Sequence, residues 1–497
     1  MSGGFRARTK SATKAQVDKE KAGGSQRRKS GRVGGAGEQQ GDKGIIAAAK
    51  KAGVDLPRAV AAETFRRVSA DDAYANLILP KALRKHRLEG RDAAFATELT
   101  YGTLRTEGVL DAVIAKCSNR ELSTLAPEVL ISLRLGAYQV LYTRVEAHAA
   151  VDTTVRLVEA FGQEKAKGFA NAVMRTITRT DAEAWMEKLS PAGEIAALAF
   201  QHAHPEWIAR SFSRVIGDEE LAEALDADSQ RPIVHLVARP GEISAEELAA
   251  ITGAEQGRYS PYAVYLESGD PGDLEPVREG LAAVQDEGSQ LIARAVTELE
   301  LQGEDNGRWL DLCAGPGGKA ALLGAIARID GAQVDAVEVS QHRAGLISKT
   351  VSDLPVRVHV TDGRDPGLRP GYDRVLVDAP CSGLGALRRR PEARWRKSES
   401  DIAELANLQA ELLDSALKLV RPGGVVVYST CSPDQRETRN IIDAALERWA
   451  GEYELEELSA QSAIPDMGDV GAHKSVQMWP HRHGTDAMFF AALRRNR

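Results

Sequence analysis

Trp309-Leu310-Asp311-Leu312-Cys313-Ala314-Gly315-Pro316-Gly317-Gly318-Lys319 is a glycine-rich turn between a predicted strand and a predicted helix, and it decides the fold of the second half of the chain. Glycine lets the backbone pass close to a ligand, and in an open α/β sheet such a turn lies at the carboxyl edge of the strands. The spacing matches neither the GxxxxGK[ST] of a phosphate-binding loop nor the GxGxxG of a dinucleotide site. The turn therefore predicts a ligand site of another kind.

Strand-like and helical segments alternate around this turn. Apolar or β-branched runs that are typical of buried strands occupy residues 308–312, 334–339, 356–360, 374–377 and 425–428, with helical patterns between them. This alternation is typical of a parallel, doubly wound sheet. We therefore expect residues 281–497 to form an α/β domain of the Rossmann-like class.

Acidic residues stand at the ends of three successive predicted strands: Asp311, Glu338 and Asp362. Each carboxylate alone could instead cap the helix that follows it. S-adenosylmethionine carries ribose hydroxyls, an adenine amino group and a sulfonium cation but no phosphate, so carboxylates suit it as acceptors and counter-charges. Three carboxylates at one sheet edge therefore favour S-adenosylmethionine as the cofactor.

Two cysteines follow later predicted strands at the same edge. Cys381 lies in Asp378-Ala379-Pro380-Cys381-Ser382-Gly383, and Cys431 lies in Ser429-Thr430-Cys431-Ser432. A thiolate that adds to carbon 6 of cytosine activates carbon 5 for methylation, and a base must then remove the carbon 5 proton so that the thiol can leave. A free cysteine is usually a buried, inert thiol, but the polar Gly/Ser surroundings argue against that state here.

The other two cysteines have plainer interpretations. We expect Cys117 to be a buried thiol on a helix. For Cys313 two interpretations are equally favoured: an inert thiol, or a residue whose backbone lines the cofactor turn. Four cysteines without CxxC pairing are too few for a disulfide scaffold or a zinc site. The spacing of the ten histidines does not match a metal-binding motif. We expect the paired histidines to be connector, loop or RNA-facing residues: His202, His204, His481 and His483.

Composition divides the chain further. The net charge is −7, yet residues 1–32 carry ten Lys/Arg against two acidic residues, so the remainder carries −7 − 8 = −15. We expect residues 1–55 to be a disordered basic arm, which is either a solubilising tail or an attractant for RNA phosphates. Residues 56–189 show helical periodicity, and residues 190–280 mix short helices and strands as in a small α+β connector. No apolar run is long enough to span a membrane and no secretory signal is evident, so we expect a cytoplasmic protein.

The motifs closely resemble those of the Sun/Fmu-type RNA cytosine-5 methyltransferases. The stretches 91–105, 133–138 and 168–175 resemble the NusB-like helical RNA-binding domain, and residues 284–290 and 484–490 carry further family resemblance. Ala487-Met488-Phe489 departs from the Gly-Phe-Phe more usual in the family, which puts the geometry of that loop in doubt. The resemblance covers about residues 56–497.

The resemblance implies roles for the site residues. Cys431 would be the nucleophile and Cys381 would assist release of the methylated base, while Asp378 would hold or protonate the base edge and Lys319 would lie in the active site. DNA cytosine methyltransferases take their nucleophile from a Pro-Cys motif and typically lack the Thr-Cys partner, so the second cysteine selects RNA. The candidate catalytic residues are Cys431, Cys381, Asp378 and Lys319; the candidate cofactor-binding residues are Asp311, Cys313, Ala314, Gly315, Pro316, Gly317, Gly318, Lys319, Glu338, Asp362 and Asp378; no metal site is expected.

The implied substrate is a flipped or unpaired cytosine of small-subunit ribosomal RNA, because a thiol cannot reach carbon 6 within a stacked helix. Transfer RNA is an alternative substrate, and a non-catalytic ribosome-assembly or transcription factor is an alternative of another class. We expect a monomer that binds RNA and neither membrane nor metal. The segment 388–397, with Arg388 at its start and Trp395 among its cations, is either a solvated loop or, as we favour, a phosphate- and base-stacking surface.

Overall fold

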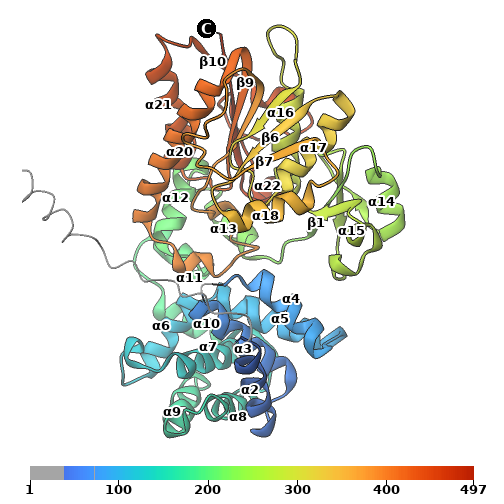
Figure 1. The fold of residues 1–497 in the computed structure, drawn as a ribbon. Helices are drawn as coiled ribbons and strands as arrows, with labels where there is room; N and C mark the ends of the chain where they lie inside the picture. The colour runs from blue at the N-terminus through green and yellow to red at the C-terminus, as the bar shows by residue number, and fades with distance from the viewer. Residues whose placement is uncertain (1–37, 72, 497) are drawn as a thin grey trace, which may run out of the picture.

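The computed structural model describes residues 38–71 and 73–496 (Figure 1). The part of the predicted basic arm before residue 38 lies outside the described residues. The prediction of disorder up to residue 55 is wrong for α2 (Glu38–Lys51), whose Ile46 and Ala49 are buried in the core of the helical domain. A short apolar stripe within a polar sequence explains the difference, because burial against neighbouring helices offsets the ordering entropy.

An all-helical domain forms the lower body of the molecule in Figure 1. Its shared core includes Phe65, Leu99, Leu133 and Met174, and the last helix contributes the buried Trp185. This confirms the predicted helical class. After α2 its elements are α3 (Leu56–Asp71), α4 (Ala75–His86), α5 (Gly90–Arg105), α6 (Glu107–Cys117), η1 (Leu122–Thr124), α7 (Pro127–Tyr142), α8 (Ala147–Ala160), η2 (Glu164–Ala166), α9 (Lys167–Ile177) and α10 (Ala182–Leu189).

The region predicted as a connector has two separate parts. The first is three helices, α11 (Glu194–Gln201), α12 (Glu206–Ile216) and α13 (Leu221–Ser229), which share a core with residues of the large α/β domain such as Leu384 and Trp479. The second is a small antiparallel sheet of order β2-β3-β1-β4. Its elements are β1 (Val234–Ala238), α14 (Ala245–Thr252), β2 (Glu255–Gln256), β3 (Ala263–Leu266), η3 (Pro271–Asp273), α15 (Glu275–Arg278) and β4 (Ala282–Val284), so the sheet continues past residue 280.

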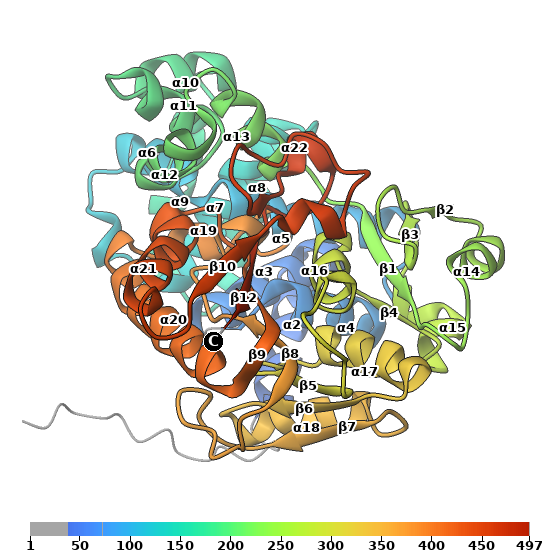
Figure 2. The ribbon, with the colours of Figure 1, turned by 90° about the horizontal axis from the view of Figure 1, so that it is seen from above.

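The large sheet has the order β10-β12-β9-β8-β5-β6-β7, with β11 paired to β12 (Figure 2). The five strands from β7 to β9 are parallel, as predicted, whereas β12 and β10 add an antiparallel edge. The strands are β5 (Arg308–Asp311), β6 (Gln333–Val337), β7 (Val356–His359), β8 (Tyr372–Asp378), β9 (Val420–Thr430), β10 (Leu455–Leu458), β11 (Val476–Gln477) and β12 (Phe489–Arg495). β12 begins within the C-terminal motif 484–490, and neither β12 nor β10 was predicted as a strand.

Helices cover both faces of this sheet. Along β9, Val427 packs in the cluster that contains α16, whereas the neighbouring Tyr428 packs in the cluster that contains α20 and α21. Alternation of side chains along a strand thus builds two cores from one strand. The remaining elements are α16 (Glu287–Glu298), α17 (Gly318–Asp330), α18 (Gln341–Thr350), η4 (Leu384–Ala386), α19 (Ala393–Arg396), α20 (Glu399–Leu419), η5 (Gln435–Glu437), α21 (Arg439–Trp449), η6 (Ala460–Ala463) and α22 (Pro480–His483).

The chain order of the parallel strands positions the ligand site. From β5 the chain moves outward through β6 and β7, then returns to β8 and β9 on the other side of β5. Such a reversal opens a crevice at the carboxyl ends of the two strands that flank it. Asp311 ends β5 and Asp378 ends β8, so both lie at this reversal. None of the helices in the described part of the chain is both long and apolar enough to cross a membrane.

The basic segment 388–397 joins the domains, and the prediction that it forms an RNA-facing surface is wrong for most of its side chains. Arg394 is fully buried and donates to the carbonyl oxygen of Asp228 at 2.6 Å. The indole nitrogen of Trp395 donates to the carbonyl oxygen of Arg105 at 3.1 Å, and its ring lies so close to Gly108 that a Cβ there would come within 2.2 Å of it. Arginine bonded to carbonyls and a packed indole are not available to bind phosphates or bases.

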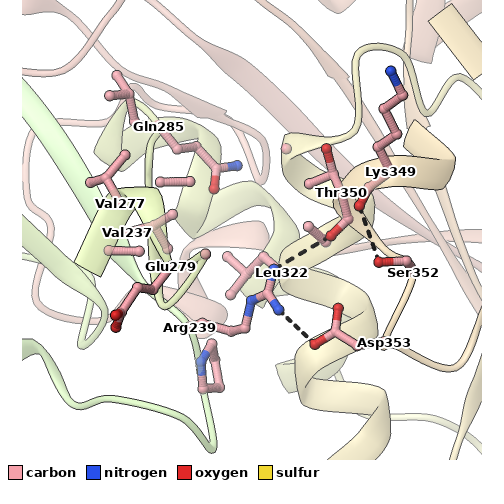
Figure 3. A pocket seen from close by; sticks show the side chains of 17 residues that line it. Val237, Arg239, Val277, Glu279, Gln285, Leu322, Lys349, Thr350, Ser352 and Asp353 are labelled. Atoms are coloured by element: carbon pink, nitrogen blue, oxygen red, sulfur yellow. Dashed lines mark hydrogen bonds and ion pairs between the residues drawn. The ribbon is translucent and has the colours of Figure 1, made fainter. Parts of the chain in front are cut away.

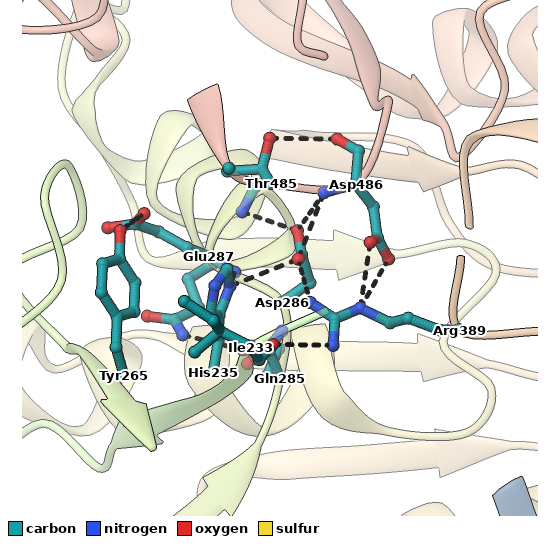
Figure 4. A network of polar contacts seen from close by, with 12 residues as sticks. Ile233, His235, Tyr265, Gln285, Asp286, Glu287, Arg389, Thr485 and Asp486 are labelled. Atoms are coloured by element: carbon teal, nitrogen blue, oxygen red, sulfur yellow. Dashed lines mark hydrogen bonds and ion pairs between the residues drawn. The ribbon is translucent and has the colours of Figure 1, made fainter. Parts of the chain in front are cut away.

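The start of this segment is also held within the protein (Figure 4). Arg388 donates to Asp486 at 2.7 Å, and Arg389 donates to Asp286 at 2.8 Å and to Asp486 at 2.9 Å. Asp286 and Asp486 come from the two stretches, 284–290 and 484–490, that carried additional family resemblance. We call these four residues the arginine cluster; it connects the segment after Cys381 to the start of α16 and to the loop before β12.

Candidate active site

The ends of β8 and β9 bring the two motif cysteines together. β8 and β9 are adjacent parallel strands, with Asp378 in register with Ser429. Cys381 and Cys431 each lie just beyond this pair, and their sulfur atoms are 3.3 Å apart. The sequence placed both thiols at one edge; the structure places them in contact.

The two thiols have opposite pKa shifts. A hydrogen bond from Cys381 lowers the pKa of Cys431 against the effect of burial, and the Lys319 ammonium also lowers it. The same hydrogen bond and burial raise the pKa of Cys381 well above its usual value. Cys431 is therefore the thiol that ionises first, while Cys381 keeps its proton. A thiolate is the nucleophilic form of cysteine.

Lys319 and Asp378 form an ion pair beside the thiols. The Lys319 ammonium lies 2.7 Å from Asp378 Oδ2, and the hydroxyl of Ser429 donates to Asp378 Oδ1 at 3.0 Å. Although burial opposes it, the Asp378 carboxylate raises the pKa of Lys319. The lysine therefore stays charged next to Cys431. The structure thus brings together all four predicted catalytic residues.

Two residues that the sequence analysis missed hold the Cys381 loop. Glu437 is fully buried and accepts from the backbone N–H of Ser382 at 2.8 Å and from the Ser382 hydroxyl. Gln409 donates to the carbonyl oxygen of Pro380 at 2.9 Å and to Glu437 at 3.1 Å. Gln409 lies far from both cysteine motifs in the chain, whereas Glu437 lies six residues after Cys431; neither has a local signal that points to the Cys381 loop. From the sequence, a carboxylate just before a helix, such as Glu437, could equally be predicted to cap that helix.

Two backbone hydrogen bonds connect the Cys381 loop to Cys431 and to the loop before β12. The backbone N–H of Gly385 donates to the carbonyl oxygen of Cys431 at 2.9 Å, and the N–H of Ala487 donates to the carbonyl oxygen of Gly385 at 2.9 Å. The stretch that departs from the family pattern at Ala487 therefore still pairs with the Cys381 loop.

The glycine-rich turn lies against the carboxylate that ends the next strand. Glu338 is 4% exposed, and a Cβ on Gly315 would lie 2.0 Å from its Oε2 atom. Only glycine allows this approach. Glu338 also accepts from the backbone of Ser340 at 2.7 Å and from Arg343 Nε at 3.1 Å. The Gly315-Pro316 peptide bond is cis, and α17 begins at Gly318.

Asp311 has an unusual environment for a carboxylate. It is fully buried; Oδ1 accepts from the backbone of Cys313 at 3.3 Å, and Oδ2 has no hydrogen-bond partner among the described residues. Burial, with the nearby charge of Asp378, raises the pKa of Asp311 from its usual 3.8 to about 7. A buried polar atom without a partner is costly, which is typical of an atom reserved for a ligand.

Asp362 differs from the other two carboxylates. It follows the end of β7, its side chain is 42% exposed, and it pairs with Arg364 at 2.6 Å. Hydrogen bonds from Arg364 lower the pKa of Asp362. Contact of Asp362 with a cofactor adenine therefore stays a prediction.

Cys117 ends α6 and is half-buried against the core of the helical domain, so it is less buried than predicted. Burial raises the pKa of Cys313 well above its usual value, so its thiol is protonated. His204 is buried 2.9 Å from Asp228, His481 contacts Glu220 at 3.1 Å, and His483 accepts from the backbone of Trp479 at 2.9 Å. Within residues 38–71 and 73–496, no group of three or more His, Cys, Asp or Glu side chains is arranged to hold a metal ion.

Comparison with protein families gives two matches. Residues 297–494 match the family described as 16S rRNA methyltransferase RsmB/F, and residues 55–179 match the NusB family. The first match contains the thiols and all of the predicted cofactor residues. The second lies within the helical domain.

Whole-length relatives agree with these matches. A Mycobacterium tuberculosis protein whose name gives it as a methyltransferase is 53% identical over 448 residues, which are 89% of this chain and 97% of that protein. The ribosomal RNA small subunit methyltransferase B of Klebsiella pneumoniae is 34% identical over 402 residues, 79% of this chain and 89% of that protein.

Among solved structures, one titled PH0851 has the same fold, with a TM-score of 0.75 and 23% identity over 91% of this chain and 99% of that one. The fold, the motif residues and the relatives agree. The chain belongs to the 16S rRNA methyltransferase RsmB/F family and is a methyltransferase with an N-terminal NusB-family region.

Proposed function

We propose that the protein transfers a methyl group from S-adenosylmethionine to carbon 5 of a cytosine in small-subunit ribosomal RNA. The observation that carries this proposal is the pair of thiols 3.3 Å apart, of which Cys431 has the lowered pKa. Two contacting thiols of unequal acidity serve a reaction that needs both a nucleophile and a second proton-transfer group. The name of the Klebsiella relative supports the ribosomal substrate.

The cofactor site has features that suit S-adenosylmethionine. The unpartnered Asp311 oxygen, the close approach of Gly315 to Glu338, and the buried Glu338 carboxylate would hold its polar groups. When bound there, S-adenosylmethionine supplies an electrophilic methyl group. We propose that residues 313–319 line this site from the glycine-rich turn, and that Asp362 accepts from the adenine.

The chain's own residues would carry the remaining steps. The Cys431 thiolate adds to carbon 6 of cytosine, which moves electron density to carbon 5, and the base edge is held by Asp378, itself paired with Lys319. After carbon 5 takes the methyl group and S-adenosylhomocysteine leaves, a base removes the carbon 5 proton. The electron pair of that C–H bond restores the double bond between carbons 5 and 6 and expels the Cys431 thiolate. Cys381, 3.3 Å from Cys431, is positioned to assist this release. The base must be unpaired for either thiol to reach it.

The NusB-family helical domain is the proposed RNA-binding module, and its attachment through segment 388–397 would present RNA to the thiols. Trp395 and Arg396, which contact the helical domain, come soon after Cys381 in the chain. Substrate docking and the reactive loop would therefore share one rigid connection.

The test uses labelled methyl transfer to purified small-subunit ribosomal RNA, with transfer RNA as a second substrate. We expect label in the ribosomal RNA, recovered as 5-methylcytosine after digestion. Cys431→Ala should abolish transfer, and Cys381→Ala should leave RNA covalently attached on a denaturing gel. Cys117→Ala, which removes a thiol from α6, is the matched control and should behave as wild type.

Three outcomes would contradict parts of this proposal. Label in transfer RNA alone would overturn the substrate. A trapped adduct with Cys431→Ala instead of Cys381→Ala would reverse the two roles. No incorporation into either RNA would overturn the enzymatic reaction and leave a protein that only binds RNA.

A further inference from the structure

A cavity of about 480 Å³ lies between the small sheet and the helices α17 and α18 (Figure 3). One wall comes from β1, β4 and α15, and the other from α17 and the end of α18. Val237, Val277 and Leu322 give it apolar walls, and Gln285, Arg239 and Lys349 give it polar groups. Its volume lies within the range of small-ligand sites.

Gln285 is directed into this cavity and has no protein partner for its amide. The residue is 8% exposed, and neither Nε2 nor Oε1 has a hydrogen-bond partner among the described residues. Its backbone is held on both sides, because its N–H donates to His235 and its carbonyl oxygen accepts from Gln290, each at 3.0 Å. A buried amide with two unmet hydrogen bonds calls for a ligand that supplies both.

The chemistry of the lining indicates which ligand that is. A glutamine amide offers a donor and an acceptor side by side, which matches the edge of a nucleobase. Arg239 donates to Asp353 at 2.8 Å and to the carbonyl oxygen of Thr350 at 3.4 Å, so its planar guanidinium is held in place as a surface on which a base can stack. At the opening, Lys349 is exposed and can meet a phosphate, while Glu279 can accept from ribose hydroxyls.

We infer that this cavity binds the base of a nucleotide, with Gln285 as the residue that reads its edge. The cavity adjoins the proposed cofactor site and shares Gly318 with it: a Cβ on Gly318, the first residue of α17, would lie 3.6 Å from Gln285 Nε2. Two sources supply this chemistry, an unpaired nucleotide of the bound RNA or a free nucleotide. The RNA source rests on the proposed function; the free nucleotide does not.

The first arm of the test measures free nucleotides. AMP, CMP, GMP and UMP are titrated by calorimetry into the full-length protein saturated with S-adenosylhomocysteine, so that the cofactor site cannot bind them. We expect at least one to bind, and Gln285→Leu, which keeps the size but removes the amide, to weaken binding about tenfold. Gln302→Leu, at an exposed glutamine outside the cavity, is the matched control. Ala321→Phe, which fills the cavity from α17, should abolish binding.

The second arm separates the sources. Small-subunit ribosomal RNA is crosslinked to the protein with ultraviolet light, and crosslinked peptides are identified by mass spectrometry. Crosslinks at residues 277–285 or 349–353 that Ala321→Phe removes would assign the cavity to RNA, whereas nucleotide binding without such crosslinks would assign it to a free nucleotide. Absence of both, or equal nucleotide binding and crosslinking by wild type and Gln285→Leu, would overturn the inference.

Two controls keep the results separate from other failures. Thermal unfolding of each variant checks that it is folded. Methyl transfer by the wild-type protein is measured in parallel, because its absence would contradict the proposed function while leaving free-nucleotide binding as a valid test of the cavity.

Discussion

Two groups of buried charges lie within the α/β domain, and they differ in how completely they are paired. In the arginine cluster, Asp286 and Asp486 each contact both Arg388 and Arg389, and Figure 4 shows the contacts of Arg389. At the carboxyl edge of the sheet, Lys319 is paired with Asp378, but one Asp311 oxygen has no hydrogen-bond partner among the described residues, and the pKa of Asp311 is raised. Fully paired charges hold a structure together, whereas unmet ones mark a place where a ligand completes the pairing.

The largest effect is expected from breaking the paired group. Asp486→Ala leaves Arg388 and Arg389 with one carboxylate fewer in a buried place, and should lower the free energy of unfolding by about 3–5 kcal/mol in urea denaturation. The exposed Asp466→Ala is the control and should change it little. A loss of less than about 1 kcal/mol for Asp486→Ala would show that the arginine cluster contributes little to the stability of the fold.

The next effect should appear mainly in catalysis, with a smaller loss of stability. Lys319→Met removes the charge beside Cys431 while Asp378, 29% exposed, can still be hydrated. We expect kcat to fall about 100-fold and the free energy of unfolding to fall by less than in Asp486→Ala, because hydration of Asp378 replaces part of its pairing with Lys319. The pKa of Cys431, followed by its alkylation rate against pH, should rise because Lys319 lowers it. Lys51→Met, at an exposed lysine, is the control; an unshifted alkylation profile in Lys319→Met would contradict the assigned role.

A pH dependence should distinguish the unpaired carboxyl. Between the usual pKa of 3.8 and the native value of about 7, folded Asp311 holds a proton that the unfolded chain releases. Its contribution to stability is therefore full at low pH and falls as pH rises through this window, by about 1.4 kcal/mol per pH unit. Asp311→Asn should remove this slope from urea denaturation measured between pH 4 and 7. Asp362→Asn, whose carboxyl has a lowered pKa, should retain it; parallel curves for wild type and Asp311→Asn would contradict the assignment.

The smallest effect is expected for Asp362, the exposed one of the three strand-end carboxylates. Asp362 pairs with Arg364 in solvent, so Asp362→Ala should change the free energy of unfolding by less than about 1 kcal/mol. If Asp362 accepts from the cofactor, the same change should weaken binding of S-adenosylhomocysteine several-fold in calorimetry. Unchanged binding would remove Asp362 from the cofactor site and leave Asp311 and Glu338 as its carboxylates.

Much of the fold followed from local patterns. Hydrophobic runs located β5, β6, β7 and β8 to within two residues but only the middle of β9, because buried parallel strands are continuous apolar segments whatever they pack against. The antiparallel β12 was not predicted, because Phe489 and its neighbours were interpreted as part of a C-terminal motif and not as a strand. Helix α2 escaped because its few apolar residues gain stability only from helices that come later in the chain.

The basic segment shows why composition misleads about surfaces. The residue types of Arg394 and Trp395 predicted an RNA-binding surface, because a sequence shows charged and aromatic residues but not the residues that they contact in the fold. Their partners, Asp228 and Arg105, are 166 and 290 residues distant in sequence. Gln285 gave no local signal either, because an amide becomes informative only when the structure leaves it buried and unpaired.

The sequence by itself determined the class of the sheet, the glycine-rich turn and the candidate chemistry of Cys381, Cys431 and Asp378, since motif residues carry their strand and turn context with them. Only the tertiary structure decided that the two sulfur atoms touch, that Lys319 pairs with Asp378, and which arginines are buried. The physical reason is that acidity, pairing and burial depend on neighbours that chain folding brings together from distant positions.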